Sequence, residues 1–146
     1  MADSVQEILD NFVPHLQDYL ERNIFNKKEI QMIVARRRDS EYLLKRRQAR
    51  KSDFLRYIQD EERLEKLRNL RWAKIVRNTP KNVVLKKGSG DQHVVNNINF
   101  IFTRMVTKFR SDISLVVQYG SYFLFDEENE FRIDTLFIIY VLASLL

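Results

Sequence analysis

Apolar residues recur at steps of three and four along most of the chain, the spacing that places them on one face of an α-helix. The first such stretch runs from Val5 to Leu20, with Pro14 inside it as an expected kink or break. Further stripes follow at 26–44 and 52–76, and then at 91–109, 112–123 and 130–146. The pattern predicts about six helices, arranged as antiparallel hairpins, and no β-sheet.

The start of the second helix is marked by its own residues. Asn26 followed by Glu29 has the spacing of a capping box, in which each side chain accepts from the backbone amide of the other. Ile24 and Phe25 come directly before it and are placed to close the end of the first helix pair.

Charged residues within the second and third helices are expected to face solvent. Arg37 and Glu41 interrupt the apolar line of the second helix and are four residues apart, so they are expected to pair on its surface. Beyond Val34 this helix is therefore expected to be only partly covered. The charged residues expected on the outside of the third helix are Glu61, Glu62, Arg63, Lys66 and Arg68.

Residues 78–90, NTPKNVVLKKGSG, are the clearest interruption of the helical pattern. They contain a proline and end in a Gly-Ser-Gly run, which is typical of a flexible connection. We therefore expect a basic amino-terminal helical region at 1–77, a linker at 78–90 and a further helical unit at 91–146.

The composition excludes several classes of site. The chain has no cysteine, which rules out a disulfide framework, a cysteine-ligated zinc site and a cysteine nucleophile. Its two histidines, His15 and His93, have no neighbouring serine or carboxylate group in the pattern of a triad or a metal site. We expect no enzymatic activity and no cofactor.

Charge is unevenly distributed. Residues 26–77 hold 17 Lys and Arg against 8 Asp and Glu, while the remainder holds 8 against 12. Within 26–51 there are ten cations against three acids, and arginine suits phosphate oxygens through its planar fork. Arg37 is set aside for its pairing with Glu41. The nine residues expected to contact RNA or an acidic partner are Lys27, Lys28, Arg36, Arg38, Lys45, Arg46, Arg47, Arg50 and Lys51.

The strings LER-x-IF-x-KKEI from Leu20 and RRRD-x-EY-x-L-x-RR from Arg36 resemble the amino-terminal region of the U-three snoRNA-associated protein six family. The resemblance covers about residues 12–76 and continues more weakly over 98–119, which looks like a half-a-TPR repeat. It implies an all-α half-a-TPR solenoid, truncated here within its first full repeat. The residues implied to pack that repeat are Phe102, Val116, Tyr119 and Phe123, with Val116 standing where the repeat usually has tryptophan.

The same resemblance implies a function. Members of the family are non-catalytic scaffold components of the small-subunit processome and the U-three snoRNP, and they support precursor-rRNA processing and small ribosomal subunit biogenesis. The implied partners are the β-propeller proteins of the same subcomplex, with precursor rRNA or U-three snoRNA as further candidates. The implied location is the nucleus and nucleolus.

Two alternatives follow from the residues themselves. The basic helix could act directly as an RNA-binding module, although Tyr42 is the one aromatic residue among its arginines and base stacking needs such rings. The apolar tail from Leu136 to Leu146 could associate with a membrane. Its eleven residues fall short of the roughly twenty that span a bilayer, so no membrane partner is expected.

Overall fold

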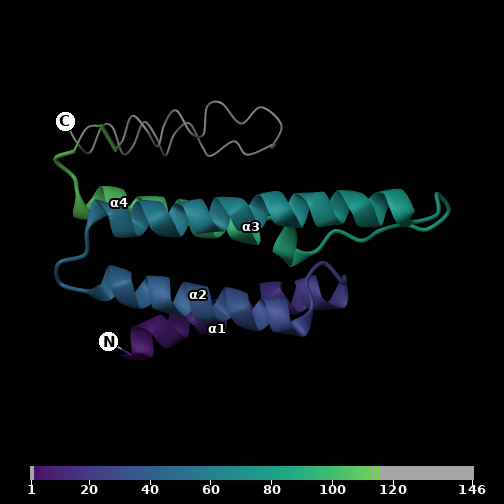
Figure 1. Cartoon of the computed structure of the whole chain (residues 1–146), viewed down its shortest axis with the longest axis horizontal. Helices are drawn as coiled ribbons and strands as arrows, with labels where there is room; N and C mark the ends of the chain where they lie inside the picture. Colours follow the sequence, from purple (N-terminus) through teal and green to yellow (C-terminus); the bar gives the residue numbers. More distant parts are fainter. Residues whose placement is uncertain (1, 113, 116–146) are drawn as a thin grey trace. The chain divides into compact units, whose positions relative to one another are not determined.

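The computed structural model describes residues 2–112 and 114–115, and the regular elements in this range are helical (Figure 1). They are α1 (Ala2–Glu21), α2 (Lys27–Lys45), α3 (Lys51–Asn78) and α4 (His93–Lys108), with a 3-10 turn, η1 (Ser89–Asp91), before α4. The helices α1, α2 and α3 alternate in direction and form consecutive antiparallel pairs (Figure 1). The predicted all-α class is confirmed, and the paired helices are consistent with a helical solenoid.

The chain divides into two compact units, Met1–Ile101 and Phe102–Leu146. The first unit contains α1, α2, α3, η1 and the first half of α4. The helices expected at 112–123 and 130–146 fall almost wholly outside the described residues. The division into parts at 1–77, 78–90 and 91–146 stays a prediction.

One face of α1 supplies much of the core of the first unit. Its buried residues are spaced alternately four and three apart, and they are Val5, Leu9, Phe12, Leu16 and Tyr19. Val13, an apolar residue within the stretch from Val5 to Leu20, is 56% exposed, and Tyr19 rather than Leu20 is buried at the end of the helix. The helix is not split at Pro14, which is exposed and lies within one continuous element.

The connection between α1 and α2 is held by a capping box and by two buried apolar residues. Asn26 accepts a hydrogen bond from the Glu29 amide at 2.9 Å, and Glu29 accepts one from the Asn26 amide at 2.9 Å, so the predicted capping box is confirmed. Asn23 has a φ of 58°, a left-handed conformation that asparagine adopts more readily than most residues. Ile24 and Phe25 are 1% and 2% exposed and close the helix pair as expected.

Glu29 also ties this connection to α3. Arg71 donates to both of its carboxylate oxygens, at 2.7 and 2.6 Å, and to the carbonyl of Ile24 at 3.1 Å. The hydrogen bonds from Arg71, followed by the one from the Asn26 amide, lower the pKa of Glu29 to about 2. One carboxylate therefore caps α2 and holds the far half of α3 against it.

The Gly88–Gly90 run, expected to end a flexible linker, lies against α1. The Tyr19 hydroxyl donates to the Gly90 carbonyl at 2.6 Å, and the Gly90 amide donates to an Asp18 carboxylate oxygen at 3.0 Å. Asp91 accepts from the Gly88 amide at 3.1 Å and so closes the turn of η1. Gly90 is buried in this position.

Replacing Gly90 by alanine should lower the free energy of unfolding by about 1–3 kcal/mol, the usual cost of overpacking. A Cβ at this position would lie 2.5 Å from Cε1 and 2.8 Å from Cδ1 of Tyr19. Because Tyr19 is 0% exposed, its ring has no free space to move into. Ser89→Ala is the matched control, since Ser89 is exposed. Urea unfolding checks the prediction, and equal midpoints for the two variants would contradict it.

Candidate docking surface and the ionic core beneath it

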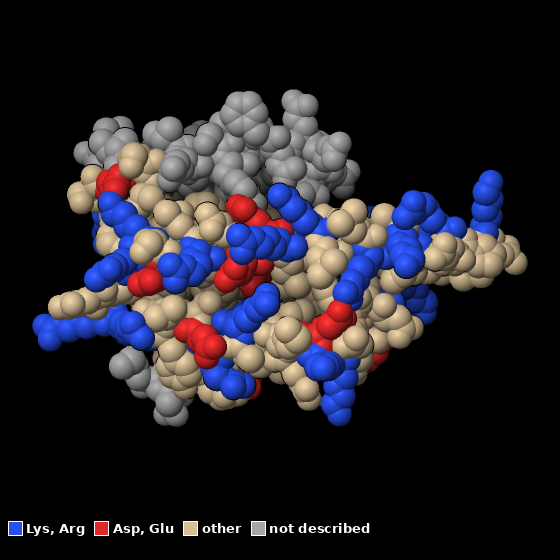
Figure 2. All heavy atoms as spheres, viewed as in Figure 1, with Lys and Arg blue, Asp and Glu red and all other residues tan. Residues whose placement is uncertain are grey.

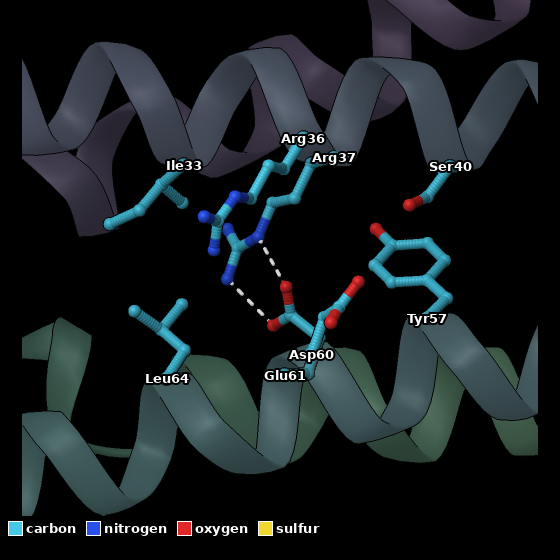
Figure 3. A pocket seen from close by; sticks show the side chains of 8 residues that line it. All are labelled: Ile33, Arg36, Arg37, Ser40, Tyr57, Asp60, Glu61 and Leu64. Carbon is cyan, nitrogen blue, oxygen red and sulfur yellow. Dashed lines mark hydrogen bonds and ion pairs between the residues drawn. The ribbon is translucent and has the colours of Figure 1, made fainter.

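A buried ion pair joins α2 to α3 (Figure 3). Arg37 is 1% exposed and donates through Nε and Nη2 to the two carboxylate oxygens of Glu61, each at 2.8 Å. Its guanidinium carbon also lies 4.6 Å from the ring centroid of Phe12 on α1. Burial alone would lower the pKa of Arg37, but the Glu61 carboxylate beside it raises that pKa, so the guanidinium stays charged. Arg37 thereby links three helices at one point.

His93, at the start of α4, is a further hydrogen-bond partner of that guanidinium. Its Nε2 lies 2.7 Å from Nη1 of Arg37, and because arginine can only donate, Nε2 is the acceptor. The ring stacks on His15 at 4.4 Å between centroids, with 15° between the planes, and meets Phe12 edge-on at 5.2 Å. Burial, then the Arg37 charge and then His15 lower the pKa of His93 to about 2. The imidazole is therefore a neutral, structural part of the core.

A second buried chain of hydrogen bonds lies beside the first. The Tyr57 hydroxyl donates to Glu41 at 3.0 Å and accepts from the Asn97 amide at 3.3 Å. Burial, followed by the charges of Glu61 and Glu41, raises the pKa of the Tyr57 hydroxyl well above its ordinary value. The expected surface pairing of Arg37 with Glu41 is wrong, because the two residues bond to different partners on α3.

The expectation that α2 is only partly covered beyond Val34 is also wrong for the face that carries Arg37. Three residues in its later turns, Arg37, Glu41 and Leu44, are 1%, 0% and 8% exposed. Polar groups are buried there because each has a specific partner, which is the condition under which a folded protein tolerates them.

A third ionic group lies toward the other end of α3. Arg68 donates to both oxygens of Glu65, at 2.9 and 2.6 Å, and contacts Asp91 at 3.4 Å. Asp91 also pairs with Arg22 at 2.8 Å, and Arg22 in turn donates to Asp18 on its own helix. These five charges fasten η1 to the ends of α1 and α3.

Two of the residues expected on the outside of α3 are therefore in the core. Glu61 and Arg68 are 3% and 6% exposed, and Glu65 is 8% exposed. The periodicity carried the signal, because Glu61, Glu65 and Arg68 continue the inward line of Phe54 and Ile58 at steps of three and four. Their charge favoured exposed positions, and the partners of Glu61 on α2 and of Arg68 on η1 are not evident from the sequence of α3.

The buried Arg37 fixes which way its neighbours point. Consecutive residues are about 100° apart around a helix, so Arg36 and Arg38 emerge on opposite flanks of α2. Both are exposed. Arg36 projects toward α3, at the edge of the small hollow drawn in Figure 3.

The nine cations expected at a contact surface are mostly exposed but are not gathered into one patch. Lys45 and Lys51 are half-buried, and the other seven are exposed. Four of the seven lie on α2 and three on the connection to α3, and α2 alone extends over roughly 28 Å at 1.5 Å per residue. Figure 2 shows blue and red spheres interspersed on the visible face rather than an unbroken blue field.

An apolar groove runs between α2 and α3 next to Arg36. It has a volume of about 240 Å³, and it is lined by Phe25, Glu29, Met32, Ile33, Arg36, Leu64 and Leu67. Met32 and Leu67 are 50% and 41% exposed at its rim. The groove with its flanking arginine is the feature of this surface best suited to hold another molecule, and the sequence did not predict it.

Of the four residues expected to pack the first repeat, Phe102 is 5% exposed. Val116, Tyr119 and Phe123 lie outside the described residues. Among the helices that the structure describes, none is both long and apolar enough to cross a membrane. Within the same residues, no group of three or more His, Cys, Asp or Glu side chains is placed to hold a metal ion.

Comparisons with known proteins match the chain to one family. The family model described as U3 small nucleolar RNA-associated protein 6 matches residues 9–93. The chain is 39% identical over 122 residues to the U3 small nucleolar RNA-associated protein 6 of Schizosaccharomyces pombe. It is 29% identical over 119 residues to the homologue from Mus musculus and 28% identical over 122 residues to that from Homo sapiens. These alignments cover 84%, 82% and 84% of this chain, but 24%, 19% and 19% of the relatives.

Proposed function

The chain belongs to the U3 small nucleolar RNA-associated protein 6 family, and from this membership we propose that it is a non-catalytic component of the U3 small nucleolar ribonucleoprotein. In this proposal it acts in the nucleolus as a helical scaffold of the small-subunit processome and supports precursor-rRNA processing. Because the chain spans 24% of the length of its Schizosaccharomyces pombe relative, the proposal concerns what this helical segment contributes to that role.

The scaffold part of the proposal is supported by the ion-paired core and by the apolar groove beside it. Arg37, Glu61 and His93 lock α2, α3 and α4 together and leave the groove beside Arg36 open to solvent. A preorganised groove binds with little loss of side-chain freedom, which is what a scaffold needs. We propose that the occupant is an amphipathic helix of a partner protein, with apolar side chains between Met32 and Leu67 and a carboxylate on Arg36.

The seven exposed cations within residues 27–50 form what we call the α2 surface. Direct RNA binding by this surface is the alternative, and its residues favour the protein partner. Asp39 is exposed next to Arg38 on α2, and Asp60 on α3 lines the same small hollow as Arg36. Both carboxylates would repel phosphates at close range. Tyr42, 45% exposed, is the one aromatic residue among the arginines, so bases have little to stack on.

Changing Arg36, Arg38, Arg46 and Arg47 to glutamine should abolish recovery of partner proteins by the tagged full chain. The four side chains are exposed, so the variant should unfold at the same urea concentration as the wild type. The measurement is affinity purification from the nucleolar fraction, with mass spectrometry for proteins and hybridisation for U3 small nucleolar RNA.

The same variant separates the two functions. Loss of protein partners with unchanged affinity for free RNA supports the scaffold. If partner recovery stayed intact while RNA affinity and its salt dependence fell, the α2 surface would be a direct RNA-binding module. A wild-type chain that recovered neither U3 small nucleolar RNA nor any processome protein would remove the proposed function itself.

A further inference from the structure

A second basic region lies outside the surface considered so far. Residues 66–90 contain eight Lys and Arg and no Asp or Glu. Arg68 is engaged with Glu65, and Arg71 with Glu29, so their charges are neutralised within the fold. Beyond Arg71 the other cations of this run are all exposed, and they are Lys74, Arg77, Lys81, Lys86 and Lys87. We call residues 74–87 the basic arm.

The basic arm is built as a projection with both ends fixed. The last turns of α3 and the connection that follows extend past the ends of α1 and α2 (Figure 1). The Thr79 hydroxyl donates to the Ile75 carbonyl at 2.6 Å, and the Val83 amide donates to the Pro80 carbonyl at 3.0 Å, which closes a turn at the tip. The chain then returns from the tip and is held against α1 through the hydrogen bonds of Gly90.

The cations of the basic arm have no counter-charge within the described residues. None of the five takes part in an ion pair there, and the far end of the arm in Figure 2 shows blue and tan without red. Lys74 and Arg77 are three apart on a helix, and Lys86 and Lys87 are adjacent, so like charges lie close together and repel. That repulsion is relieved when a polyanion binds.

We propose that the basic arm binds the phosphate backbone of RNA. A surface of one sign fits a polymer of uniform opposite charge better than it fits a protein segment, whose charges are mixed. Four of the five cations are lysines, which act as mobile point charges and suit phosphates without fixed geometry. This inference goes beyond the proposed scaffold role, because it assigns a different partner to a different surface.

Recognition by the basic arm is independent of base sequence. Trp72, the aromatic residue nearest to it in the chain, is half-buried, and the guanidinium of Arg22 lies 5.0 Å from its ring centroid. Residues 74–87 contain no aromatic side chain on which a base could stack. The affinity therefore comes from counterion release and depends strongly on salt.

The test uses the full chain and a short duplex RNA of arbitrary sequence, with fluorescence anisotropy over a series of salt concentrations. Five phosphate contacts should give a slope of log affinity against log salt of about −3.5 to −4.5, at roughly 0.7–0.9 per contact. Changing Arg77, Lys81, Lys86 and Lys87 to glutamine should reduce the magnitude of that slope by about 3 and the low-salt affinity by at least about tenfold.

The matched control is the quadruple glutamine variant of Arg36, Arg38, Arg46 and Arg47, which loses the same four charges from the α2 surface. It should retain the RNA affinity and the salt slope of the wild type. A milder variant, Lys86→Gln with Lys87→Gln, changes no helix residue and should still reduce the magnitude of the slope by about 1.4 to 1.8.

Several outcomes would overturn the inference. Equal losses in both quadruple variants would show a net-charge effect with no dedicated site, and undetectable RNA binding by the wild type would show no site at all. The wild type could instead bind anionic phospholipid vesicles through the arm and not bind RNA. In that case the basic arm, with its exposed Val83 and Val84, would be a lipid-binding surface. Loss of protein partners alone in the arm variant would make it a second protein-docking surface. None of these results bears on partner recovery by the α2 surface, so the scaffold role succeeds or fails separately.

Discussion

Replacing Arg37 by methionine should lower the free energy of unfolding by about 3–5 kcal/mol, because it leaves a buried carboxylate without its cation. Glu61 is 3% exposed and accepts two hydrogen bonds from Arg37, each at 2.8 Å. A methionine side chain fills similar space but donates nothing. Urea unfolding, monitored by circular dichroism, measures this loss of stability. If the wild-type chain is only marginally stable, the variant will be partly unfolded at room temperature.

Two further variants make the prediction specific. Arg38→Met carries the same substitution one residue along on an exposed flank and should change stability by no more than about 0.5 kcal/mol. Adding Glu61→Leu to Arg37→Met should restore much of the loss, since an apolar pair in place of a buried ion pair is often neutral or stabilising. If Arg37→Met and Arg38→Met had equal effects, the ion pair would not be holding α2 to α3.

The helices of the first unit could be predicted because their signals are local. Steps of three and four in the apolar residues located α1, α2 and α3, and the Asn26–Glu29 spacing located the start of α2. Each of these signals involves residues within a few turns of one another. The helical class and the capping box could therefore be predicted from the sequence, and both predictions are confirmed.

The partners of Arg37 could not be predicted because they are distant from it in sequence. Arg37 and Glu41 are four residues apart and so suggested a pair within one helix. The true partner of Arg37 is Glu61, 24 residues away, and His93 is 56 residues away. Which residues meet depends on the register between α2, α3 and α4. The apolar periodicity of one helix does not determine that register.

The candidate site shows the same division between local and distant information. The positions of the cations follow directly from the sequence, and Arg36 and Arg38 are exposed as an RNA or protein contact requires. The groove beside Arg36 depends on the separation of α2 and α3, so the exposure of Met32 and Leu67 at its rim was not foreseen. The contact roles of all nine cations, and the packing of Val116, Tyr119 and Phe123, stay predictions.

The stability of the chain should fall as the pH decreases below about 6.5, and His93 should be the cause. Its pKa in the folded protein is about 2, below the ordinary value of 6.5, so the unfolded chain binds the proton first. The stabilisation is therefore complete above pH 6.5 and decreases at lower pH by about 1.4 kcal/mol per unit, which gives a loss of roughly 2 kcal/mol at pH 5. The loss continues until the folded pKa near 2 is reached.

Urea unfolding between pH 7.5 and 5 isolates this histidine from the carboxylates. Glu29 has its pKa lowered from 4.5 to about 2, so its own contribution is lost only below pH 4.5. His93→Gln keeps an acceptor for Arg37 but has no titrating ring, so it should flatten the profile between pH 7 and 5. His15→Gln removes the least of the three causes of the shift, and most of the slope should remain. If the wild-type profile were flat over this range, the imidazole would be able to take up its proton inside the fold, and the contact between His93 and Arg37 would not hold α4 in place.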